Sequence, residues 1–302
     1  MIRLAIRVAS EQADVVLAEL LELAPAGVEE VQVGAETIEY AVYGAPGELP
    51  ALPDLRALAG EALVEISTTE VADDWQERWK GFHRPVLIAA PSAQDGVGEA
   101  PVPVPALHVR PPWEAPSAHC DGAVREIVID PGQAFGTGAH ASTRLCLELL
   151  LELSARQRLR GALLDVGTGS GVLAIAAAGL GFDPVLGLDH ERESVEAARE
   201  NADVNGVKLE VRRFELRTQS LPWMGDGGDA PGGPLVVLAN LLRPLLLELA
   251  TTMTTAPSHL IAGGLLREEA DEIGAAFADR LGLRERERRV AGEWSALWLT
   301  AP

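Results

Sequence analysis

Apolar and polar side chains alternate over four short stretches in the first 70 residues of the chain, a pattern that predicts β-strands. The four predicted strands cover residues 2–9, 28–33, 37–43 and 64–69. Ser10 is suited to cap a helix with apolar positions at helical spacing, and residues 53–63 predict a second helix. The order strand, helix, strand, strand, helix, strand is that of a ferredoxin-like α+β domain, which we expect over residues 1–72.

From about residue 124 the pattern changes to strands that alternate with helices. Four apolar runs, each followed by a helical pattern, cover residues 161–167, 184–189, 234–240 and 259–264. Repeated strand-helix units predict a mostly parallel sheet covered by helices on both faces, and thus an α/β domain over residues 124–302. Residues 283–290 and 294–300 are two strands with no helix between them, so we expect the last strand to enter the sheet antiparallel through a hairpin.

The segment between the two predicted domains, residues 73–123, is expected to connect them. It begins with a short predicted helix that places Trp75 and Trp79 on one face, where burial between the domains is the simplest interpretation. Residues 89–122 contain seven prolines and little periodicity, which is typical of a linker. One strand-like stretch, LHVR, interrupts them.

Composition and charge exclude several classes of protein. With 25 basic and 45 acidic side chains the net charge is -20, so we expect no direct binding of nucleic acid. Cys120 and Cys146 are the only cysteines, and no cluster of His, Cys and carboxylates has metal-ligand spacing, so neither a disulfide framework nor a metal site is predicted. Arg3 and Arg7 interrupt the first apolar stretch, and no run is long enough to span a membrane. We therefore expect a cytoplasmic protein.

The strongest local motif is LLDVGTGSG, residues 163–171, in which a strand runs into three alternating glycines. Such glycines allow a tight turn and let a ligand approach the main chain. The motif is not the dinucleotide fingerprint G-x-G-x-x-G, because Val172 stands where its last glycine would be, and this argues against NAD. The spacing suits the G-x-G-x-G turn of class I methyltransferases, which bind S-adenosylmethionine. Alone, the motif could also be only a tight connection.

Two polar side chains end later strands of the same predicted sheet. Asp189 follows Gly167 by 22 residues, at a place where a carboxylate can accept both ribose hydroxyls of an adenosine. Asn240 ends another strand, and its amide offers donors and an acceptor for orienting an amine. Either residue alone would more simply cap a helix. Because ligands of open α/β sheets bind at the carboxyl ends of the strands, the three features together predict a cofactor site there.

A glycine-rich loop, residues 131–140, precedes the motif and admits two interpretations. It can be a lid that folds over a ligand, or a rigid connection. His140, at its end, invites the role of a catalytic base, although a lone histidine without a defined partner is more simply a packing or hydrogen-bonding residue.

The chain resembles the ribosomal protein L11 methyltransferase (PrmA-type) family over nearly its whole length. The resemblance rests on the stretches DDWQERWKGFHRP, LHVRPPWE, DPGQAFGTGAHASTRLCLELL, LLDVGTGSGVLAIAAAGLG, EAARENADVNGV and ANLLRPLLLELA. It implies a Rossmann-like class I methyltransferase domain and an N-terminal ferredoxin-like domain that holds the substrate. It also implies transfer of methyl groups from S-adenosylmethionine to lysine amines of a basic ribosomal protein, with the N-terminal amine as a further candidate acceptor.

Carried over by position, the family's cofactor contacts fall on Thr143, Gly167, Asp189 and Asn240. The complete set of candidate cofactor-binding residues is Thr143, Asp165, Gly167, Gly169, Gly171, Asp189 and Asn240. Asn240 is also the candidate catalytic residue, because its amide could orient the acceptor amine.

Two alternatives remain open at this level. Ala139 and His190 depart from the family's usual residues, which leaves room for a non-catalytic S-adenosylmethionine-binding assembly protein. Another protein lysine could also be the acceptor, since related enzymes use the same catalytic domain on other substrates. We expect the chain to act as a monomer.

Overall fold

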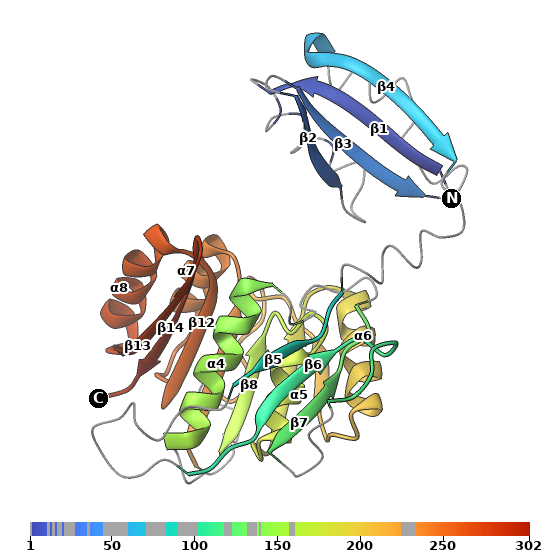
Figure 1. Ribbon diagram of the computed structural model, residues 1–302. Helices are drawn as coiled ribbons and strands as arrows, with labels where there is room; N and C mark the ends of the chain where they lie inside the picture. The colour runs from blue at the N-terminus through green and yellow to red at the C-terminus, as the bar shows by residue number, and fades with distance from the viewer. Residues whose placement is uncertain are drawn as a thin grey trace. The chain divides into compact units, whose positions relative to one another are not determined.

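In the computed structural model the chain forms two compact units, Met1–Phe82 and His83–Pro302 (Figure 1). The residues that the structure describes are 2–10, 13, 16, 20, 28–34, 37–44, 60–70, 83–89, 102–117, 123–131, 138, 140–156, 161–224 and 233–302. The predicted helix with Trp75 and Trp79 lies outside them, as does Cys120.

The first unit contains a four-stranded antiparallel sheet in the order β2-β3-β1-β4. Its strands are β1 (Ile2–Ala9), β2 (Glu29–Gly34), β3 (Thr37–Gly44) and β4 (Leu63–Glu70). Helical positions 13, 16 and 20 are buried against the apolar face of this sheet. The predicted N-terminal antiparallel-sheet domain is therefore confirmed. Apart from a 3-10 turn at Gly60–Ala62, the helix predicted over residues 53–63 lies outside the described residues or, at Leu63, in β4.

The opposite face of this sheet carries an ion-pair ladder. Arg3 and Arg7 on β1 both bind the carboxylate of Glu39 on β3, at 2.6 and 2.7 Å, and Arg7 also binds Glu65 on β4. The hydrogen bond from Arg3 is the main reason why the pKa of Glu39 lies below its ordinary value, although burial opposes the shift. These charges satisfy one another across three strands.

The second unit is built on a seven-stranded sheet in the order β10-β9-β8-β11-β12-β14-β13. The strands are β8 (Ala162–Val166), β9 (Val185–Asp189), β10 (Glu210–Arg213), β11 (Leu235–Asn240), β12 (His259–Leu266), β13 (Arg284–Ala291) and β14 (Trp294–Thr300). The first five in the sheet run parallel, and β14 is antiparallel to both of its neighbours, as predicted. β10 was not predicted, because Val211 is its only buried residue. β13, at one edge, alternates arginine and glutamate.

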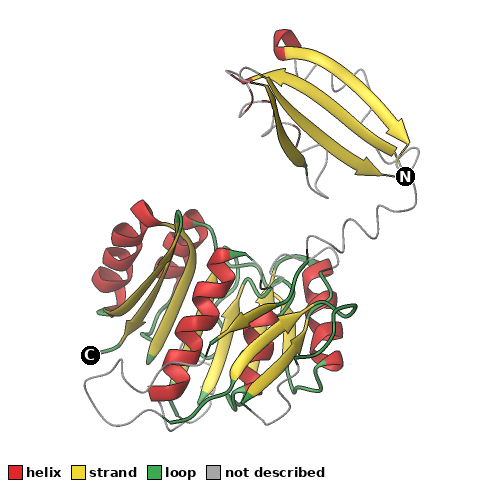
Figure 2. Ribbon diagram, viewed as in Figure 1, coloured by secondary structure: helices red, strands yellow, loops and turns green. Residues whose placement is uncertain are grey.

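Helices cover both faces of this sheet, so the predicted three-layer arrangement is confirmed (Figure 2). The helices are α4 (Ala141–Arg156), α5 (Val172–Gly179), α6 (Arg192–Val204), α7 (Arg243–Thr252) and α8 (Ala270–Leu281). α4 and α5 pack with one set of alternating strand residues, including Leu163 and Leu238. α7 and α8 pack with the other set, including Leu164 and Val237. None of the helices in the described part of the chain could cross a membrane.

A second, three-stranded sheet in the order β5-β6-β7 lies in the same unit. It consists of β5 (Val86–Ile88), β6 (Ala106–Arg110) and β7 (Val124–Val128). Ile88, Leu107, Val109 and Ile127 from this sheet are buried in the core that α4 and α5 form. Part of the segment expected to be a linker, residues 73–123, thus contributes two strands to the core of the second unit.

Candidate active site

The glycine motif forms a turn between β8 and α5. Gly167, Gly169 and Gly171 have φ values of 74°, 52° and 84°, in the left-handed region that disfavours other residues. A Cβ atom on Gly167 would lie 2.3 Å from Leu241 Cδ2, and one on Gly171 would lie 3.1 Å from the Cβ of Ala198 on α6. The backbone conformation therefore favours glycine at all three positions, and the close approach of Ala198 favours it further at Gly171.

Asp189, at the end of β9, is held directly against this turn. Its Oδ2 accepts a hydrogen bond from the Gly169 N–H at 2.9 Å, and its Oδ1 accepts one from the Glu191 N–H at 3.1 Å. The turn is further fixed by the N–H groups of Gly167 and Thr168, which both donate to the Leu188 carbonyl. The structure thus brings together the carboxylate and the glycine backbone that the sequence placed on neighbouring strand ends.

A cavity of about 480 Å³ opens at this edge of the sheet. Five of the seven predicted cofactor residues line it, namely Thr143, Gly167, Gly169, Asp189 and Asn240. A smaller cavity of about 250 Å³ shares Gly167 and Asp189 with the first and continues toward Phe214, beyond the end of β10. The larger volume lies within the range of small-molecule sites, and the adjoining space suits a ligand with two distinct parts.

Asp165 and Gly171, the other two predicted cofactor residues, do not line either cavity. Asp165 is buried on β8 and accepts a hydrogen bond from the Thr168 hydroxyl at 2.7 Å. Burial raises the pKa of Asp165 to about 7, and the nearby charge of Asp189 contributes to this shift. Gly171 lies where α5 begins, against Ala198. Asp165 therefore supports the turn through its hydrogen bond with Thr168, and Gly171 supports it through close packing against Ala198.

Asn240 and Thr143 meet on the side of the cavity formed by β11 and α4. The Asn240 Nδ2 donates to the Thr143 hydroxyl at 3.2 Å, and Thr143 itself is completely buried. The Asn240 Oδ1 is buried and has no hydrogen-bond partner among the described residues. A buried acceptor left without a donor is costly, so the described residues do not complete the hydrogen bonds of this amide in the cavity wall.

His140 and Trp294 form an aromatic pair in the cavity wall. Their rings meet edge to face with centroids 4.7 Å apart, and the His140 Nδ1 lies 2.8 Å from the Ser142 hydroxyl. Burial lowers the pKa of His140 below its ordinary value of 6.5, which favours the neutral ring at pH 7. These are the contacts of a packing and hydrogen-bonding residue. Trp294 was not predicted, because it begins a hairpin strand that is remote in sequence.

The question of a lid or a rigid connection concerns residues 131–140, of which only Pro131, Gly138 and His140 are described; Ala139 is not. Gly138 has a φ of 84°, and a Cβ atom there would lie 2.7 Å from Val109 Cγ1 on β6.

In the described ranges, no group of three or more His, Cys, Asp and Glu side chains could hold a metal ion.

Comparison with known proteins gives consistent results. The family model described as "Ribosomal protein L11 methyltransferase (PrmA)" matches residues 54–301. Proteins named ribosomal protein L11 methyltransferase match from Syntrophotalea carbinolica, with 38% identity over 78% of this chain and 70% of that protein, and from Pelobacter propionicus, with 35% identity over 77% and 68%.

Among solved structures, this chain is similar to the ribosomal protein L11 methylase from Lactobacillus delbrueckii subsp. bulgaricus. The identity is 30% and the TM-score 0.54, with 65% of this chain and 94% of that chain covered. The family match spans all residues that line the cavity.

Proposed function

Because the chain belongs to the ribosomal protein L11 methyltransferase (PrmA) family, we propose that it transfers methyl groups from S-adenosylmethionine to lysine amines of ribosomal protein L11. The observation that supports this most directly is the cavity, where the glycine turn, Asp189 and Asn240 meet at one edge of the parallel sheet. It lies where ligands of open α/β folds bind.

The residues present fit the cofactor. Each oxygen of the Asp189 carboxylate accepts one backbone N–H, so each retains capacity for a ribose hydroxyl. Gly167 and Gly169 leave the main chain open to the ligand. The smaller cavity beside Phe214 and Leu216 suits the flat adenine ring. Bound here, S-adenosylmethionine supplies an electrophilic methyl group on a sulfonium.

The acceptor amine has to be oriented and kept uncharged. A free lysine amine has a pKa of about 10.4, so roughly three units separate it from neutrality at pH 7. Burial among Trp294, Leu241 and Leu245 disfavours the ammonium, and the neutral His140 adds no charge. We expect Asn240, whose amide donates to Thr143, to orient the amine toward the methyl group. A dedicated general base is not required.

We expect the N-terminal domain, predicted over residues 1–72, to serve as the recognition domain, as the family resemblance implies. Residues 1–80 carry 16 acidic and 5 basic side chains, so more than half of the net charge of -20 lies in about a quarter of the chain. Such a field speeds the encounter with a basic ribosomal protein and fades as salt screens it. The enzyme acts as a monomer in the cytoplasm, where ribosomal proteins are made.

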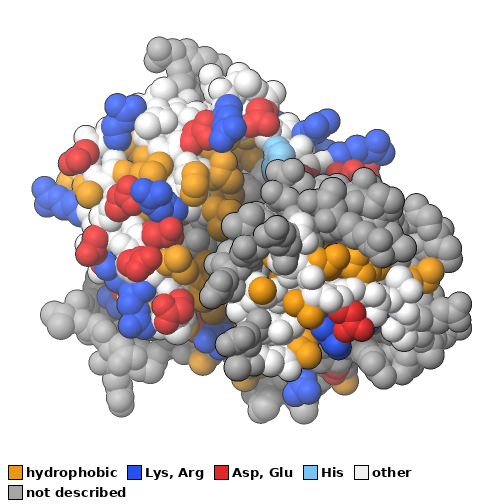
Figure 3. Space-filling model, turned by 90° about the horizontal axis from the view of Figure 1, so that it is seen from above, with side chains coloured by type: hydrophobic (Ala, Val, Ile, Leu, Met, Phe, Trp, Pro, Cys, Tyr) orange, Lys and Arg blue, Asp and Glu red, His pale blue; other side chains and the backbone are white. Residues whose placement is uncertain are grey.

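Direct contact with nucleic acid is not part of this function. Several exposed arginines of the second unit are paired with carboxylates, for example Arg217 with Glu248 and Arg243 with Glu272. In the view of Figure 3, coloured basic and acidic side chains lie next to one another, not in separate patches of one sign. A phosphate backbone would have to displace these partners.

Transfer of radiolabelled methyl groups to purified L11, followed by mass spectrometry of its peptides, tests the proposal. We expect label on lysines, at a rate that falls with added salt. Cofactor binding without transfer would instead favour a non-catalytic assembly protein, and label only on another protein would overturn the choice of substrate. A chain that lacks residues 1–70 should still bind the cofactor and lose transfer to L11.

A further inference from the structure

Two asparagines lie at the C-terminal end of α6: Asn201 is buried in its last turn, and Asn205 is the residue that caps the helix. Ala198, Asn201 and Ala202 are buried, and Asn205 is half-buried, whereas Arg199 and Glu200 between them are exposed. An amide on a buried face is destabilising unless its hydrogen bonds are satisfied. The hydrogen-bond partners of the two asparagines therefore indicate the role of each side chain.

Asn201 joins two chain segments that are far apart in sequence. Its Oδ1 accepts a hydrogen bond from the Asp130 N–H at 3.0 Å, and its Nδ2 donates to the Ser170 carbonyl at 2.9 Å. Ser170 is the residue between Gly169 and Gly171 in the glycine turn. One amide group thus ties the turn to the residue that leads from β7 toward Pro131.

The carbonyl of Ser170 sets the orientation of a peptide plane inside the turn. The Gly171 N–H, which belongs to the same peptide group as the Ser170 carbonyl, donates to the Thr168 carbonyl at 2.8 Å. Earlier in the turn, the Gly169 N–H donates to Asp189. Asp189 and Asn201 are therefore two polar side chains that hold the turn at different backbone groups. Asp189 lines the cavity, whereas Asn201 is not among the residues that line it.

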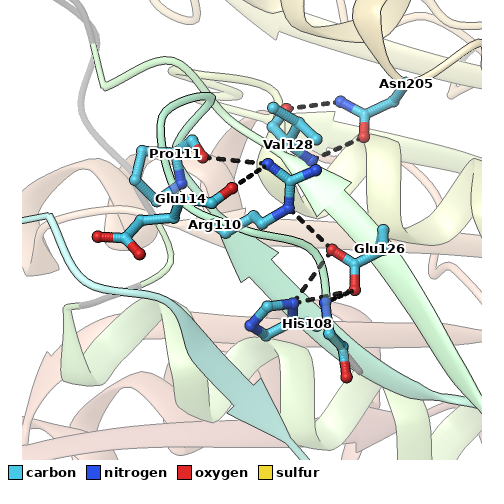
Figure 4. A network of polar contacts seen from close by, with 8 residues as sticks. His108, Arg110, Pro111, Glu114, Glu126, Val128 and Asn205 are labelled. Carbon is cyan, nitrogen blue, oxygen red and sulfur yellow. Dashed lines mark hydrogen bonds and ion pairs between the residues drawn. The ribbon is translucent and has the colours of Figure 1, made fainter. Parts of the chain in front are cut away.

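Asn205, the residue that caps α6, offers a comparison close by in the sequence. Its Oδ1 accepts from the Val128 N–H at 2.8 Å, and its Nδ2 donates to the Val128 carbonyl at 2.7 Å (Figure 4). A further hydrogen bond reaches the carbonyl of Asn201 within the helix. Asn205 thus makes the same kind of contact with the end of β7, but none of these bonds reaches the glycine turn.

We propose that Asn201 is a positioning residue for the cofactor: it fixes the glycine turn, and with it the Gly169 N–H and Asp189, in the geometry that binds S-adenosylmethionine. This rests on the proposed function. Asn205, by contrast, stabilises the fold only. Both side chains join the end of α6 to the backbone at or just after β7, so loss of either side chain should destabilise the unit. Only the loss of the Asn201 side chain should also weaken cofactor binding.

The test compares Asn201→Ala and Asn201→Asp with Asn205→Ala and Asn205→Asp in the full-length chain. Asn201→Asp keeps an acceptor for the Asp130 N–H but sets an oxygen against the Ser170 carbonyl. Calorimetric titration with S-adenosylmethionine should give a Kd raised roughly tenfold in both Asn201 variants and less than about twofold in both Asn205 variants. Urea unfolding should show comparable losses of stability for the two alanine variants.

Equal Kd values for the Asn201 and Asn205 variants would overturn the inference while leaving the proposed function intact. Failure of the wild-type chain to bind would overturn both. If the Asn201 variants do not fold, the wild-type protein still decides the matter by nuclear magnetic resonance. The side-chain amide resonance of Asn201 should shift on addition of cofactor while that of Asn205 stays in place; an unmoved Asn201 resonance would contradict the proposal.

Discussion

The cavity edge of the seven-stranded sheet and the polar network of the three-stranded sheet both gather charged and amide side chains at neighbouring strands, but they differ in how far their hydrogen bonds are completed. At the cavity, each Asp189 oxygen accepts one backbone N–H, and the Asn240 Oδ1 accepts no hydrogen bond from any described residue. The Asp189 carboxylate therefore retains capacity for a ligand in the cavity.

The three-stranded sheet shows the opposite arrangement (Figure 4). Glu126 on β7 accepts hydrogen bonds from its cross-strand neighbour His108, from Arg110 and from the Ser117 N–H. The other end of Arg110 donates to the carbonyls of Pro111 and Glu114. The protein itself completes this network, which folds the chain after β6 back onto the sheet.

The comparison teaches that polar residues at strand ends are not by themselves a site. A polar group whose partners lie in the same chain holds a loop, and one with remaining capacity beside a cavity is available to a ligand. The comparison predicts that changes at the cavity act mainly on binding and catalysis, whereas changes in the network act mainly on the stability of the fold.

The largest effect is expected for Asp189→Ala. It removes the acceptor for two ribose hydroxyls, each worth roughly 1.5 to 3 kcal/mol before solvent compensation, so the cofactor Kd should rise by at least about a hundredfold. Calorimetric titration measures this directly. Asp189→Asn, which keeps the shape and one acceptor, serves as the control and should lose less. An unchanged affinity in the alanine variant would exclude the ribose role.

Asn240→Ala should separate catalysis from cofactor binding. If the amide orients the acceptor amine, the rate of methylation at saturating cofactor should fall on the order of a hundredfold. The cofactor Kd should change by less than about tenfold, because Asp189 and the glycine turn remain. Single-turnover kinetics with L11 would show the split, and a rate equal to wild type would rule out the orienting role.

Arg110→Ala should act on stability instead. It removes one of three donors to the Glu126 carboxylate, one of two donors to the Pro111 carbonyl and the side-chain donor to the Glu114 carbonyl, which should cost about 1 to 3 kcal/mol in the free energy of unfolding. Chemical denaturation measures this. The exposed pair of Arg212 and Glu210 offers a matched control, since Arg212→Ala should change stability by less than about 1 kcal/mol. Cofactor affinity should stay the same in both variants.

The smallest expected effect is a pH dependence of the free energy of unfolding, through the Glu126 carboxylate. Burial raises the pKa of Glu126, but the hydrogen bonds from the Ser117 N–H, Arg110 and His108 outweigh it and hold the pKa below the ordinary value of 4.5. A depressed pKa means that the ionised carboxylate contributes stability above pH 4.5, and that this contribution is lost as the pH falls through the folded-state value. The stability difference between wild type and Glu126→Gln should therefore shrink in acid; a constant difference from pH 7 to pH 3 would contradict it.

Much of the site could be predicted because it depends on local rules. Left-handed glycines and strand-end polar residues are visible in the sequence at Gly167, Asp189 and Asn240, and parallel topology brings strand ends to one edge. Trp294 could not be predicted as part of the cavity, because only the antiparallel pairing of β14 with β12 brings it to His140.

The three-stranded sheet was harder to predict for a related reason. β5 has three residues, and prolines interrupt the periodicity before and after β6, so only LHVR had the pattern of a strand. The pairing of His108 with Glu126 depends on a parallel register across 18 residues. Such long-range pairing is set by the packing of Leu107 and Ile127 into the core and not by local sequence.

The alternating arginines and glutamates of β13 have a consequence for the enzyme in a crowded cell. An outermost strand presents unpaired N–H and C=O groups, and a flat apolar one would invite strands of other molecules to join the sheet. In β13, Arg288 is paired with Glu285 and Asp271, and Arg289 with Glu287. An incoming strand would have to strip water from these charges or break these pairs, so the charged rim protects the sheet against polymerisation and aggregation.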